Sequence, residues 1–396
     1  MVLSVNHPLR LGFVAGEASS DLLASDILKN LTVRGIPFIA EGIAGPEMEK
    51  QGCRVLFPLK WLSIMGLGEI IKQLPRLICL RWRIYRHFIK NPPDVFIGID
   101  APEFNLTLEK KLKRHHIRTI HYVSPSVWAW RAWRLKKIAK AVDLILTLFP
   151  FEQQFYTKHH IPVAYVGHPF ADQIPFETDT LNARKELSLP TLSPIIALLP
   201  GSRRNEINYL GQLFLETAQR CQQKNAKLII VVALLNAELR EQFTALKLAL
   251  APQLSLLMIE GQARKVMAAA DVILLASGTA SLEGMLLKKP MVVAYRMSMV
   301  SYWMAKSLVK TKYIALPNLL ADEPIVPEFI QTMATTENLS HALSNYLENP
   351  QLNINLQKKF LLLHQQLRND ASQKAVDAML SLVGLKTVVR SVYHET

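Results

Sequence analysis

Short aliphatic runs alternate with amphipathic helical patterns along most of this chain. The clearest run, residues 271–276, is almost unbroken in aliphatic side chains, which is typical of a strand buried in a parallel sheet. In the first half, the pattern predicts strands at 11–15, 38–43, 54–58, 94–100, 119–123 and 144–147, and helices at 21–31, 68–90 and 105–115. In the second half, it predicts strands at 195–199, 227–233, 256–259, 271–276 and 291–295, with helices between them. Each half therefore predicts an α/β fold with a doubly wound sheet.

The length of 396 residues exceeds that of a usual single-core domain. We expect one domain at residues 1–172 and a second at 173–365, with the polar segment 173–187 as the linker. Residues 366–396 complete the chain as a helix and tail. Their spacing leaves open whether this helix packs on the N-terminal domain.

Three predicted strands run into a small, polar turn and then a helix. The turns lie within GEASSD (16–21), LLPGSRRNE (198–206) and ASGTASLE (276–283). A turn of this kind leaves N–H groups unpaired at the positive end of a helix dipole, where a phosphate can bind. Open α/β sheets bind ligands beyond the carboxyl ends of their strands, so we expect two sheets facing a cleft. The alternative for each turn is an ordinary helix N-cap.

The turns of the second half form a candidate site for a nucleotide diphosphate. Glu283 can accept hydrogen bonds from two ribose hydroxyls, and Arg203 can stabilise charge on a departing diphosphate. The alternative for Arg203 is a surface arginine, and Asn318 next to a bend can be simply turn-forming. The candidate nucleotide-binding residues are Ser202, Arg203, Ser277, Gly278, Thr279, Ala280, Ser281, Glu283 and Asn318, which become the donor side if the protein transfers a group from a nucleotide.

The first half supplies a candidate reaction centre. Asp100 ends a predicted strand, where the ligand crevice of an α/β sheet lies, and is a candidate general base; its alternative is a helix N-cap. Asp100 and Arg203 are thus the candidate catalytic residues. His121 lacks metal-ligand spacing, so a structural or substrate-contact role is expected. The acceptor or cleft set comprises Glu17, Ser19, Asp100, His121 and Ser124.

The net charge of +14 is concentrated in one region. Between Lys72 and Lys140, sixteen Lys or Arg stand against four Asp or Glu, so the rest of the chain contributes only +2. The same region carries an apolar helical stripe and tryptophans at positions 128, 130 and 133. Basic and aromatic residues beside apolar ones suit an anionic membrane surface. The predicted membrane-contacting residues are Ile70, Ile71, Leu74, Leu77, Ile78, Arg76 and Arg81.

Two alternatives remain for this region. One is a core-facing amphipathic helix with a solvated basic side. The other is nucleic-acid binding, which lacks a recognised binding module, so we expect no nucleic-acid partner. The apolar runs are much shorter than the roughly 20 residues of a transmembrane helix, and the N-terminus does not resemble a secretory signal. Three widely spaced cysteines form neither a disulfide framework nor a metal motif, which favours a reducing cytoplasm; we expect no metal and no cofactor.

Seven collinear blocks resemble the lipid-A-disaccharide synthase family. They are GEASSD (16–21), GIDAPEFN (98–105), YVSPSVWAWR (122–131), VGHPFAD (166–172), LPGSRRNEI (199–207), ASGTASLE (276–283) and LPNLLA (316–321). The resemblance implies a GT-B fold, with two Rossmann-like domains: an N-terminal, membrane-facing acceptor domain and a C-terminal UDP-sugar domain. It implies a hexosyltransferase that joins UDP-2,3-diacylglucosamine and 2,3-diacylglucosamine 1-phosphate (lipid X) into the β-1,6 disaccharide 1-phosphate of lipid A, releasing UDP.

The resemblance also implies a location and site roles. It implies a Gram-negative bacterium, peripheral attachment to the cytoplasmic face of the inner membrane and, by analogy only, a homodimer. The family's essential aspartate matches Asp100, its phosphate-region arginine matches Arg203, and its LPN asparagine matches Asn318. The family usually reads GEASGD, and Ser20 replaces the last glycine here. If that position needs a positive φ or very close backbone approach, Ser20 is unfavourable.

The residues and the resemblance together predict an inverting, single-displacement transfer with Asp100 as the base. A UDP-sugar epimerase of the same architecture is the alternative; it would use the same C-terminal site but gains nothing from the basic N-terminal region. An NAD-dependent oxidoreductase requires G-x-G-x-x-G followed by an acidic residue, and the first turn does not supply that pattern.

Overall fold

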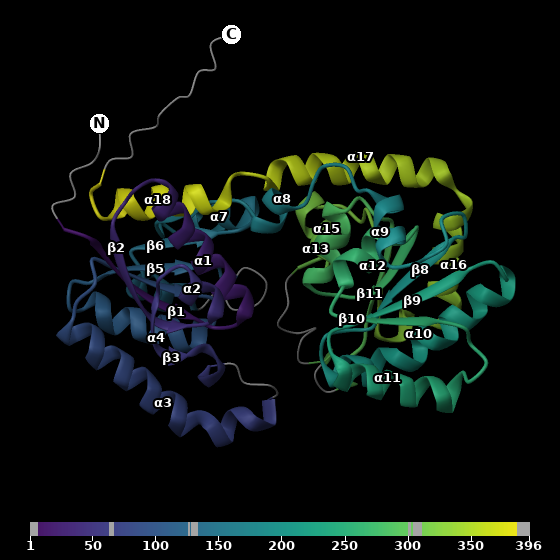
Figure 1. Ribbon diagram of the computed structural model, residues 1–396, viewed down its shortest axis with the longest axis horizontal. Coiled ribbons are helices and arrows are strands. Elements are labelled where there is room, and N and C mark those ends of the chain that lie inside the picture. Colours follow the sequence, from purple (N-terminus) through teal and green to yellow (C-terminus); the bar gives the residue numbers. More distant parts are fainter. Residues whose placement is uncertain are drawn as a thin grey trace, which may run out of the picture. The chain divides into compact units, whose positions relative to one another are not determined.

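A computed structural model describes residues 7–62, 67–125, 127, 134–299, 302–303 and 311–385, with the side chains of residues 67–73 outside the description. The chain forms two compact units, one of Met1–Asp172 with Leu367–Thr396 and one of Gln173–Gln366 (Figure 1). Each unit contains a parallel sheet between layers of helices, so both have the Rossmann-like architecture that the alternating pattern predicts.

The first unit has a seven-stranded sheet in the order β3-β2-β1-β4-β5-β6-β7. Its strands are β1 (Leu9–Ala15), β2 (Phe38–Ala44), β3 (Arg54–Pro58), β4 (Val95–Ile99), β5 (Arg118–Tyr122), β6 (Leu144–Thr147) and β7 (Val163–Tyr165). Its helices are α1 (Ala18–Val33), α2 (Pro46–Lys50), α3 (Leu67–Lys90), α4 (Pro102–Lys113), α6 (Leu135–Ala141), α7 (Pro150–Lys158), α8 (Pro169–Gln173) and α18 (Ala371–Leu382), with a short turn η1 (Leu59–Trp61).

The strands of the first sheet are buried on both faces, because side chains alternate between two cores. On β1, Phe13 packs in the core that includes residues of α1 and α18, whereas Val14 packs with residues of α3 and α4. On β4, Ile97 packs in the same core as Phe13, and Phe96 packs in the same core as Val14. This two-sided burial explains why the strands read as continuous aliphatic runs instead of alternating ones.

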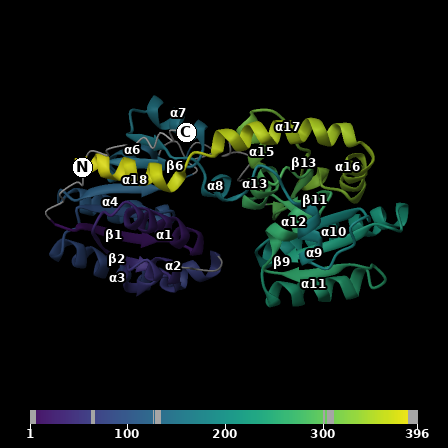
Figure 2. The same ribbon diagram turned by 45° about the horizontal axis from the view of Figure 1, so that its top comes forward.

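The C-terminal helix α18 belongs to the first unit and lies against α1 (Figures 1 and 2). The Asp172 carboxylate accepts hydrogen bonds from the backbone N–H groups of Asn369 (3.0 Å) and Ala371 (2.7 Å) at the start of this helix. Arg34 on the α1 side forms an ion pair with Asp377 of α18. The last residue of the VGHPFAD block thus caps the helix that ends the described chain.

The second unit has a six-stranded parallel sheet in the order β10-β9-β8-β11-β12-β13. Its strands are β8 (Ile195–Leu199), β9 (Ile229–Leu234), β10 (Leu257–Glu260), β11 (Val272–Ala276), β12 (Met291–Tyr295) and β13 (Glu328–Ile330). Its helices are α9 (Thr180–Glu186), α10 (Arg204–Lys224), α11 (Ala237–Leu250), α12 (Ala263–Ala269), α13 (Thr279–Leu286), α15 (Leu316–Ala321), α16 (Thr336–Glu348) and α17 (Pro350–Leu367), with a short turn η3 (Gln331–Met333).

Some predicted elements differ from the structure. The segment expected to be a linker contains α9, whose buried Arg184 binds the Asp271 carboxylate at 2.8 Å and so fastens the segment to the second unit. The edge strands β7 and β13, each three residues long, were not predicted. Pro75 lies inside α3, which continues on both sides of it.

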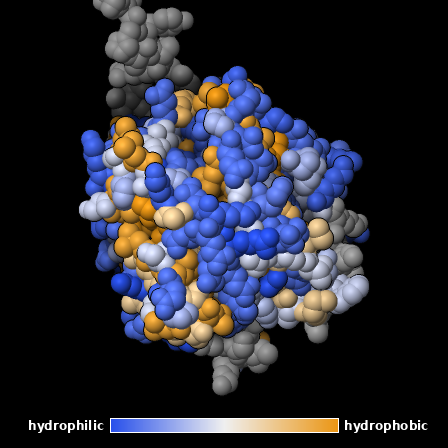
Figure 3. Space-filling model, turned by 90° about the vertical axis from the view of Figure 1, so that its right-hand side faces the viewer, coloured by the Kyte–Doolittle hydropathy of each residue, from blue (hydrophilic) through white to orange (hydrophobic). Residues whose placement is uncertain are grey.

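One face of the molecule can be described by its hydropathy. The face on the right-hand side of Figure 1 is mostly hydrophilic, and its apolar residues form patches separated by polar ones (Figure 3). Scattered exposed apolar residues of this kind are ordinary for a folded protein. Within the described residues, no helix combines the length and the apolar character needed to cross a bilayer.

Candidate active site

Asp100 lies in a strained turn between β4 and α4. Asp100 and Ala101 both have left-handed backbone conformations, with φ values of 54° and 41°. This region is unfavourable for residues other than glycine, by about 1 kcal/mol or more for each residue. The turn is held from both sides: the Asp100 N–H donates to the Tyr122 carbonyl at 2.9 Å, and the Asn105 side chain donates to the Asp100 carbonyl at 2.8 Å. The backbone is therefore fixed, and the half-buried Asp100 carboxyl projects from a defined position.

The turn after β1 lies directly beside the Asp100 turn. A Cβ atom on Gly16 would be 2.6 Å from the Cβ of Ala101, so glycine is needed for this close approach. Glu17 and Ser19 follow at the start of α1, and both are exposed. Three of the predicted acceptor-side residues are therefore grouped at one edge of the first sheet.

Ser20 does not occupy the kind of position that would require glycine through a positive φ. It lies in the first turn of α1, and its φ is not positive. Its side chain is buried, and within the described residues its hydroxyl has no hydrogen-bond partner. Serine is unfavourable here because its hydroxyl is buried without a partner, which lowers the free energy of unfolding by about 1–3 kcal/mol.

Two of the predicted acceptor-side residues, His121 and Ser124, are buried. His121 is fully buried on β5, and its Nδ1 is 2.8 Å from Oε1 of Glu109 on α4. Ser124 is buried as well, and its hydroxyl is 3.0 Å from that of Tyr156. The His121 side chain has no exposed surface, so an influence of His121 on Asp100 would pass through its neighbours.

In the second unit, the turn between β8 and α10 is closed by its own helix. Gly201 has a φ of 134°, and Oε2 of Glu206 accepts hydrogen bonds from the N–H groups of Ser202 (2.8 Å) and Arg203 (3.3 Å). These amides are therefore engaged, and a carboxylate occupies the place where an anion would bind. The Arg203 side chain is exposed. Arg203 lies near Tyr295 at the end of β12. Burial and the Glu206 carboxylate raise the pKa of Tyr295, and the positive charge of Arg203 opposes this rise.

The turn between β11 and α13 is open. The Ser277 hydroxyl donates to the Ile314 carbonyl at 3.0 Å, and the Ser281 hydroxyl donates to the Gly278 carbonyl at 2.8 Å. Gly278 and Thr279 are exposed, and a Cβ atom on Gly278 would meet nothing within 4 Å. The first N–H groups of α13, from Thr279 and Ala280, have no acceptor within the helix by geometry. This turn can bind an anion through its backbone.

Two further donor-side predictions acquire a different geometry. Oε2 of Glu283 accepts a hydrogen bond from Nε of Arg264 at 2.8 Å, so one of its two oxygens is already engaged. The amide of Asn318 is buried and bonds to the backbone N–H of Val326 and to Oε1 of Glu328, at 2.9 and 2.7 Å. Asn318 thus fastens the start of α15 through hydrogen bonds to Val326 and Glu328.

Sequence reasoning missed Glu206 and Tyr295 as members of this edge of the second sheet. β8, β11 and β12 are neighbours, so the turns after them meet at one edge. The capping-box spacing of Glu206 from Arg203 and the position of Tyr295 at the end of a predicted strand were signals that could have revealed them. Among the described residues, no group of three or more His, Cys, Asp or Glu is arranged to hold a metal ion.

The basic region shows two apolar stripes on α3. Leu80, Ile84 and Phe88 are buried against the first sheet. Leu74, Ile78 and Trp82 repeat with the same four-residue spacing but are 48%, 54% and 50% exposed. Leu77 is partly buried, whereas the side chains of Ile70 and Ile71 lie outside the described residues, as do the tryptophans at 128, 130 and 133. The alternative of a purely core-facing helix therefore does not account for α3.

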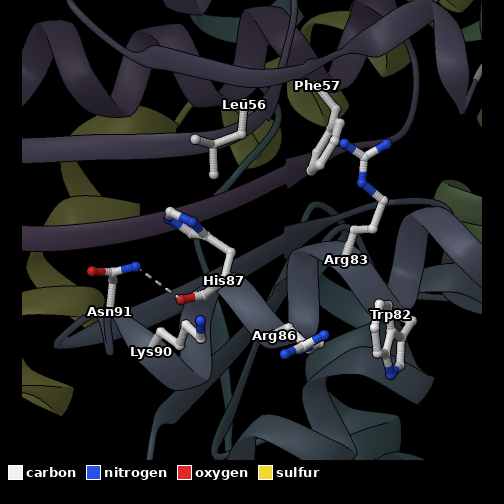
Figure 4. Close-up of a pocket in the computed structure, with 8 residues that line it drawn as sticks. All are labelled: Leu56, Phe57, Trp82, Arg83, Arg86, His87, Lys90 and Asn91. Carbon is white, nitrogen blue, oxygen red and sulfur yellow. Dashed lines mark hydrogen bonds between the residues drawn. The ribbon is translucent and has the colours of Figure 1, made fainter.

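Arginines flank the exposed stripe. The guanidinium carbon of Arg86 lies 4.6 Å from the centre of the Trp82 ring, and that of Arg83 lies 4.7 Å from the centre of the Phe57 ring. Together with Lys90, these two arginines line a surface pocket of about 380 Å³ between α3 and β3 (Figure 4). Arg76 is exposed. Arg81 is placed differently, because it packs over Phe104 at 4.9 Å and donates to the Glu103 carbonyl next to the Asp100 turn.

Comparison with known proteins gives the family. The model of the lipid-A-disaccharide synthetase family matches residues 11–379. The lipid-A-disaccharide synthase of Pseudoalteromonas translucida is 49% identical over 377 residues, which cover 95% of this chain and 97% of that protein.

Solved structures show the fold more broadly. A glycosyltransferase from Rickettsia africae aligns with a TM-score of 0.59 at 12% identity, over 96% of this chain and 99% of that one. A UDP-GlcNAc 2-epimerase from Neisseria meningitidis bound to UDP-GlcNAc aligns with a TM-score of 0.61 at 14% identity, over 94% and 99%. Fold alone therefore does not separate transferase from epimerase, and the family match decides. Because the family model and the relative match nearly its whole length, this chain belongs to the lipid-A-disaccharide synthase family of GT-B glycosyltransferases.

Proposed function

We propose that this protein transfers 2,3-diacylglucosamine from UDP to the 6-hydroxyl of 2,3-diacylglucosamine 1-phosphate, forming a β-1,6-linked disaccharide 1-phosphate and releasing UDP. The observation that carries this proposal is the family match over residues 11–379. Two features of the structure support it: the carboxyl group of Asp100 lies in a fixed turn of the first unit, and the N-terminus of α13 in the second unit is open.

Asp100 acts as the general base. It takes the proton from the 6-hydroxyl of the acceptor as that oxygen attacks the anomeric carbon of the donor. Attack on the face opposite the α-linked UDP inverts the anomeric centre in one displacement, with no covalent enzyme intermediate. The tethered backbone supports this role, because a base must keep its orientation while it receives a proton.

The β11–α13 turn binds the diphosphate of the donor. Its exposed Gly278 and Thr279 leave room for a phosphate at the positive end of the α13 dipole. The exposed Arg203 guanidinium stabilises the negative charge that develops as UDP leaves. Glu283 keeps one carboxylate oxygen for a ribose hydroxyl while Arg264 fixes the other.

Activity is tested by mixing the protein with UDP-2,3-diacylglucosamine and lipid X. Release of UDP together with a disaccharide 1-phosphate of the expected mass supports the proposal. A parallel reaction with UDP-GlcNAc alone tests the alternative function. Conversion of UDP-GlcNAc into a 2-epimer, without transfer to lipid X, contradicts the proposal and favours the epimerase.

We also propose that α3 attaches the protein to the cytoplasmic face of the inner membrane. The exposed stripe Leu74, Ile78 and Trp82 contacts the acyl region, and the flanking arginines contact anionic head groups. Replacing Leu74 and Ile78 by Ser should reduce sedimentation with phosphatidylglycerol vesicles. The matched control replaces Leu248 and Leu250, which are exposed on α11, by Ser. Equal sedimentation of both double variants contradicts the role of α3.

A further inference from the structure

A buried polar pair lies behind the Asp100 turn and has no part in the reaction as described so far. Glu109 on α4 and His121 on β5 both have fully buried side chains, and His121 Nδ1 is 2.8 Å from Glu109 Oε1. Burial raises the pKa of the Glu109 carboxyl, and the neighbouring His121 opposes this shift. Removing two ionisable groups from water is unfavourable, and hydrophobic residues of similar volume often serve stability as well or better. Stability alone therefore gives no reason for this pair.

The pair is connected to Asp100 through Gly98 and Asn105. A Cβ atom on Gly98 would lie 2.2 Å from Oε1 of Glu109 and 2.9 Å from Cβ of Asn105, so both side chains fill the space that glycine leaves. In the sheet register, His121 is the β5 partner of Gly98. Asn105 in turn donates a hydrogen bond to the Asp100 carbonyl. Glu109 and Asn105 thus lie on either side of Gly98, between His121 and the backbone of the candidate base.

Three buried atoms of this cluster share one property. Within the described residues, Glu109 Oε2, His121 Nε2 and Asn105 Oδ1 have no hydrogen-bond partner in the protein. Buried polar atoms are nearly always satisfied, by protein groups or by ordered water. Each of these three atoms is therefore available to an ordered water.

We propose that Glu109 and His121 are positioning residues that hold Asn105, and through it the Asp100 turn, in the orientation needed for catalysis. The left-handed conformation of Asp100 is intrinsically unfavourable, so a loosened Asn105 would let the turn relax and rotate the carboxyl group. A displacement of about 1 Å at a reacting group can lower the rate by about 10²-fold. This inference rests on the proposed role of Asp100 as the base.

The experiment compares two substitutions of one residue in the full-length protein. Glu109→Gln keeps a hydrogen-bonding group next to His121, whereas Glu109→Leu keeps a similar volume without one. Glu109→Leu should lower kcat by about 10- to 10²-fold and leave KM for both substrates unchanged within about threefold. Glu109→Gln should retain at least about a third of kcat, because the conservative variant preserves the hydrogen bond. Leu108 is a buried neighbour of Glu109 on α4 and belongs to the same core cluster as Phe96 and Phe104, so Leu108→Val should leave kcat unchanged.

Each outcome decides between positioning and mere support of the fold. A Glu109→Leu variant that loses thermal stability but keeps kcat overturns the proposal. So does a Glu109→Gln variant that loses as much kcat as Glu109→Leu. If Glu109→Leu does not fold, His121→Phe removes the same hydrogen bond from the other side, and an unchanged kcat there overturns the proposal equally. Asp100→Asn separates the role of Asp100 as the base from the positioning role of Glu109 and His121. If Asp100→Asn is active, the proposed base is wrong. If Asp100→Asn is inactive while Glu109→Leu is fully active, only the positioning role is rejected.

Discussion

The Asp100 turn and the Ser277–Thr279 turn are both strand-to-helix connections, yet they present opposite parts of the chain. At Asp100, hydrogen bonds hold the backbone and a carboxyl side chain projects from it. At residues 277–279, hydrogen bonds hold the hydroxyls of Ser277 and of the following Ser281, and the helix N-terminus is left open to solvent. The first turn is suited to proton transfer and the second to anion binding. The same supersecondary unit thus serves two kinds of chemistry, according to which of its polar groups are already bonded.

The largest effect is expected from removing the carboxylate of the first turn. Asp100→Asn should lower kcat by about 10²- to 10⁴-fold, because an amide cannot accept the proton. Affinity for UDP, measured by calorimetry, should stay unchanged, because that ligand is assigned to the other turn. A large loss of UDP affinity in Asp100→Asn would contradict the division of roles.

The next effect concerns the open turn. Thr279→Glu places a negative charge at the start of α13, where it should raise the Kd for UDP by about 10- to 10²-fold through repulsion of the diphosphate. The same charge complements the helix dipole, so the free energy of unfolding should rise by about 0.3–1 kcal/mol. Thr279→Gln is the control for side-chain size. Equal UDP affinity in the Glu and Gln variants would show that the diphosphate does not bind at this turn.

Acid should affect the first unit through His168. Burial lowers the pKa of His168 to about 4, so the unfolded chain binds its proton more tightly. Stability from this group is complete above about pH 6.5 and is lost as the pH falls toward 4. Between pH 6.5 and 5, the free energy of unfolding should fall by roughly 1–2 kcal/mol. Amide hydrogen exchange of β4, compared in wild type and His168→Asn, measures this; a pH dependence that persists in the variant would assign it to other groups.

The smallest effect concerns backbone strain at the first turn. Ala101→Gly should raise the free energy of unfolding by about 0.5–1 kcal/mol, because glycine accepts the left-handed conformation without a steric penalty. Chemical denaturation measures this change. A destabilised variant would mean that the contact between the Ala101 methyl group and Gly16 outweighs the strain.

The sheets could be predicted because aliphatic runs report burial directly. Strands β4, β8 and β11 are buried along their whole length and were recognised. The edge strands β7 and β13 are short and only partly buried, so they give little signal. Helix α9 is polar in sequence and owes its place to buried hydrogen bonds of Arg184, which no local pattern reveals.

The candidate site could be predicted only as far as the position of each turn. Asp100, Glu17 and Thr279 lie at strand ends or helix starts, which sequence patterns locate well. Whether a polar side chain is free or bonded depends on partners in other elements of the fold, as Asn318 and His121 show. On α3, the sequence pattern named Leu74 and Ile78 of the exposed stripe but not the buried stripe Leu80, Ile84 and Phe88, because helical periodicity does not say which face meets the core.

The capping of α18 by Asp172 has a consequence for synthesis of the protein. The polypeptide leaves the first unit after Asp172 and rejoins it only at Leu367. Because chains emerge from the ribosome N-terminus first, the Gln173–Gln366 unit is fully translated before the first unit receives its last helix. The half made first is therefore the half completed last, and during that interval the apolar surface that α18 will cover is available to chaperones.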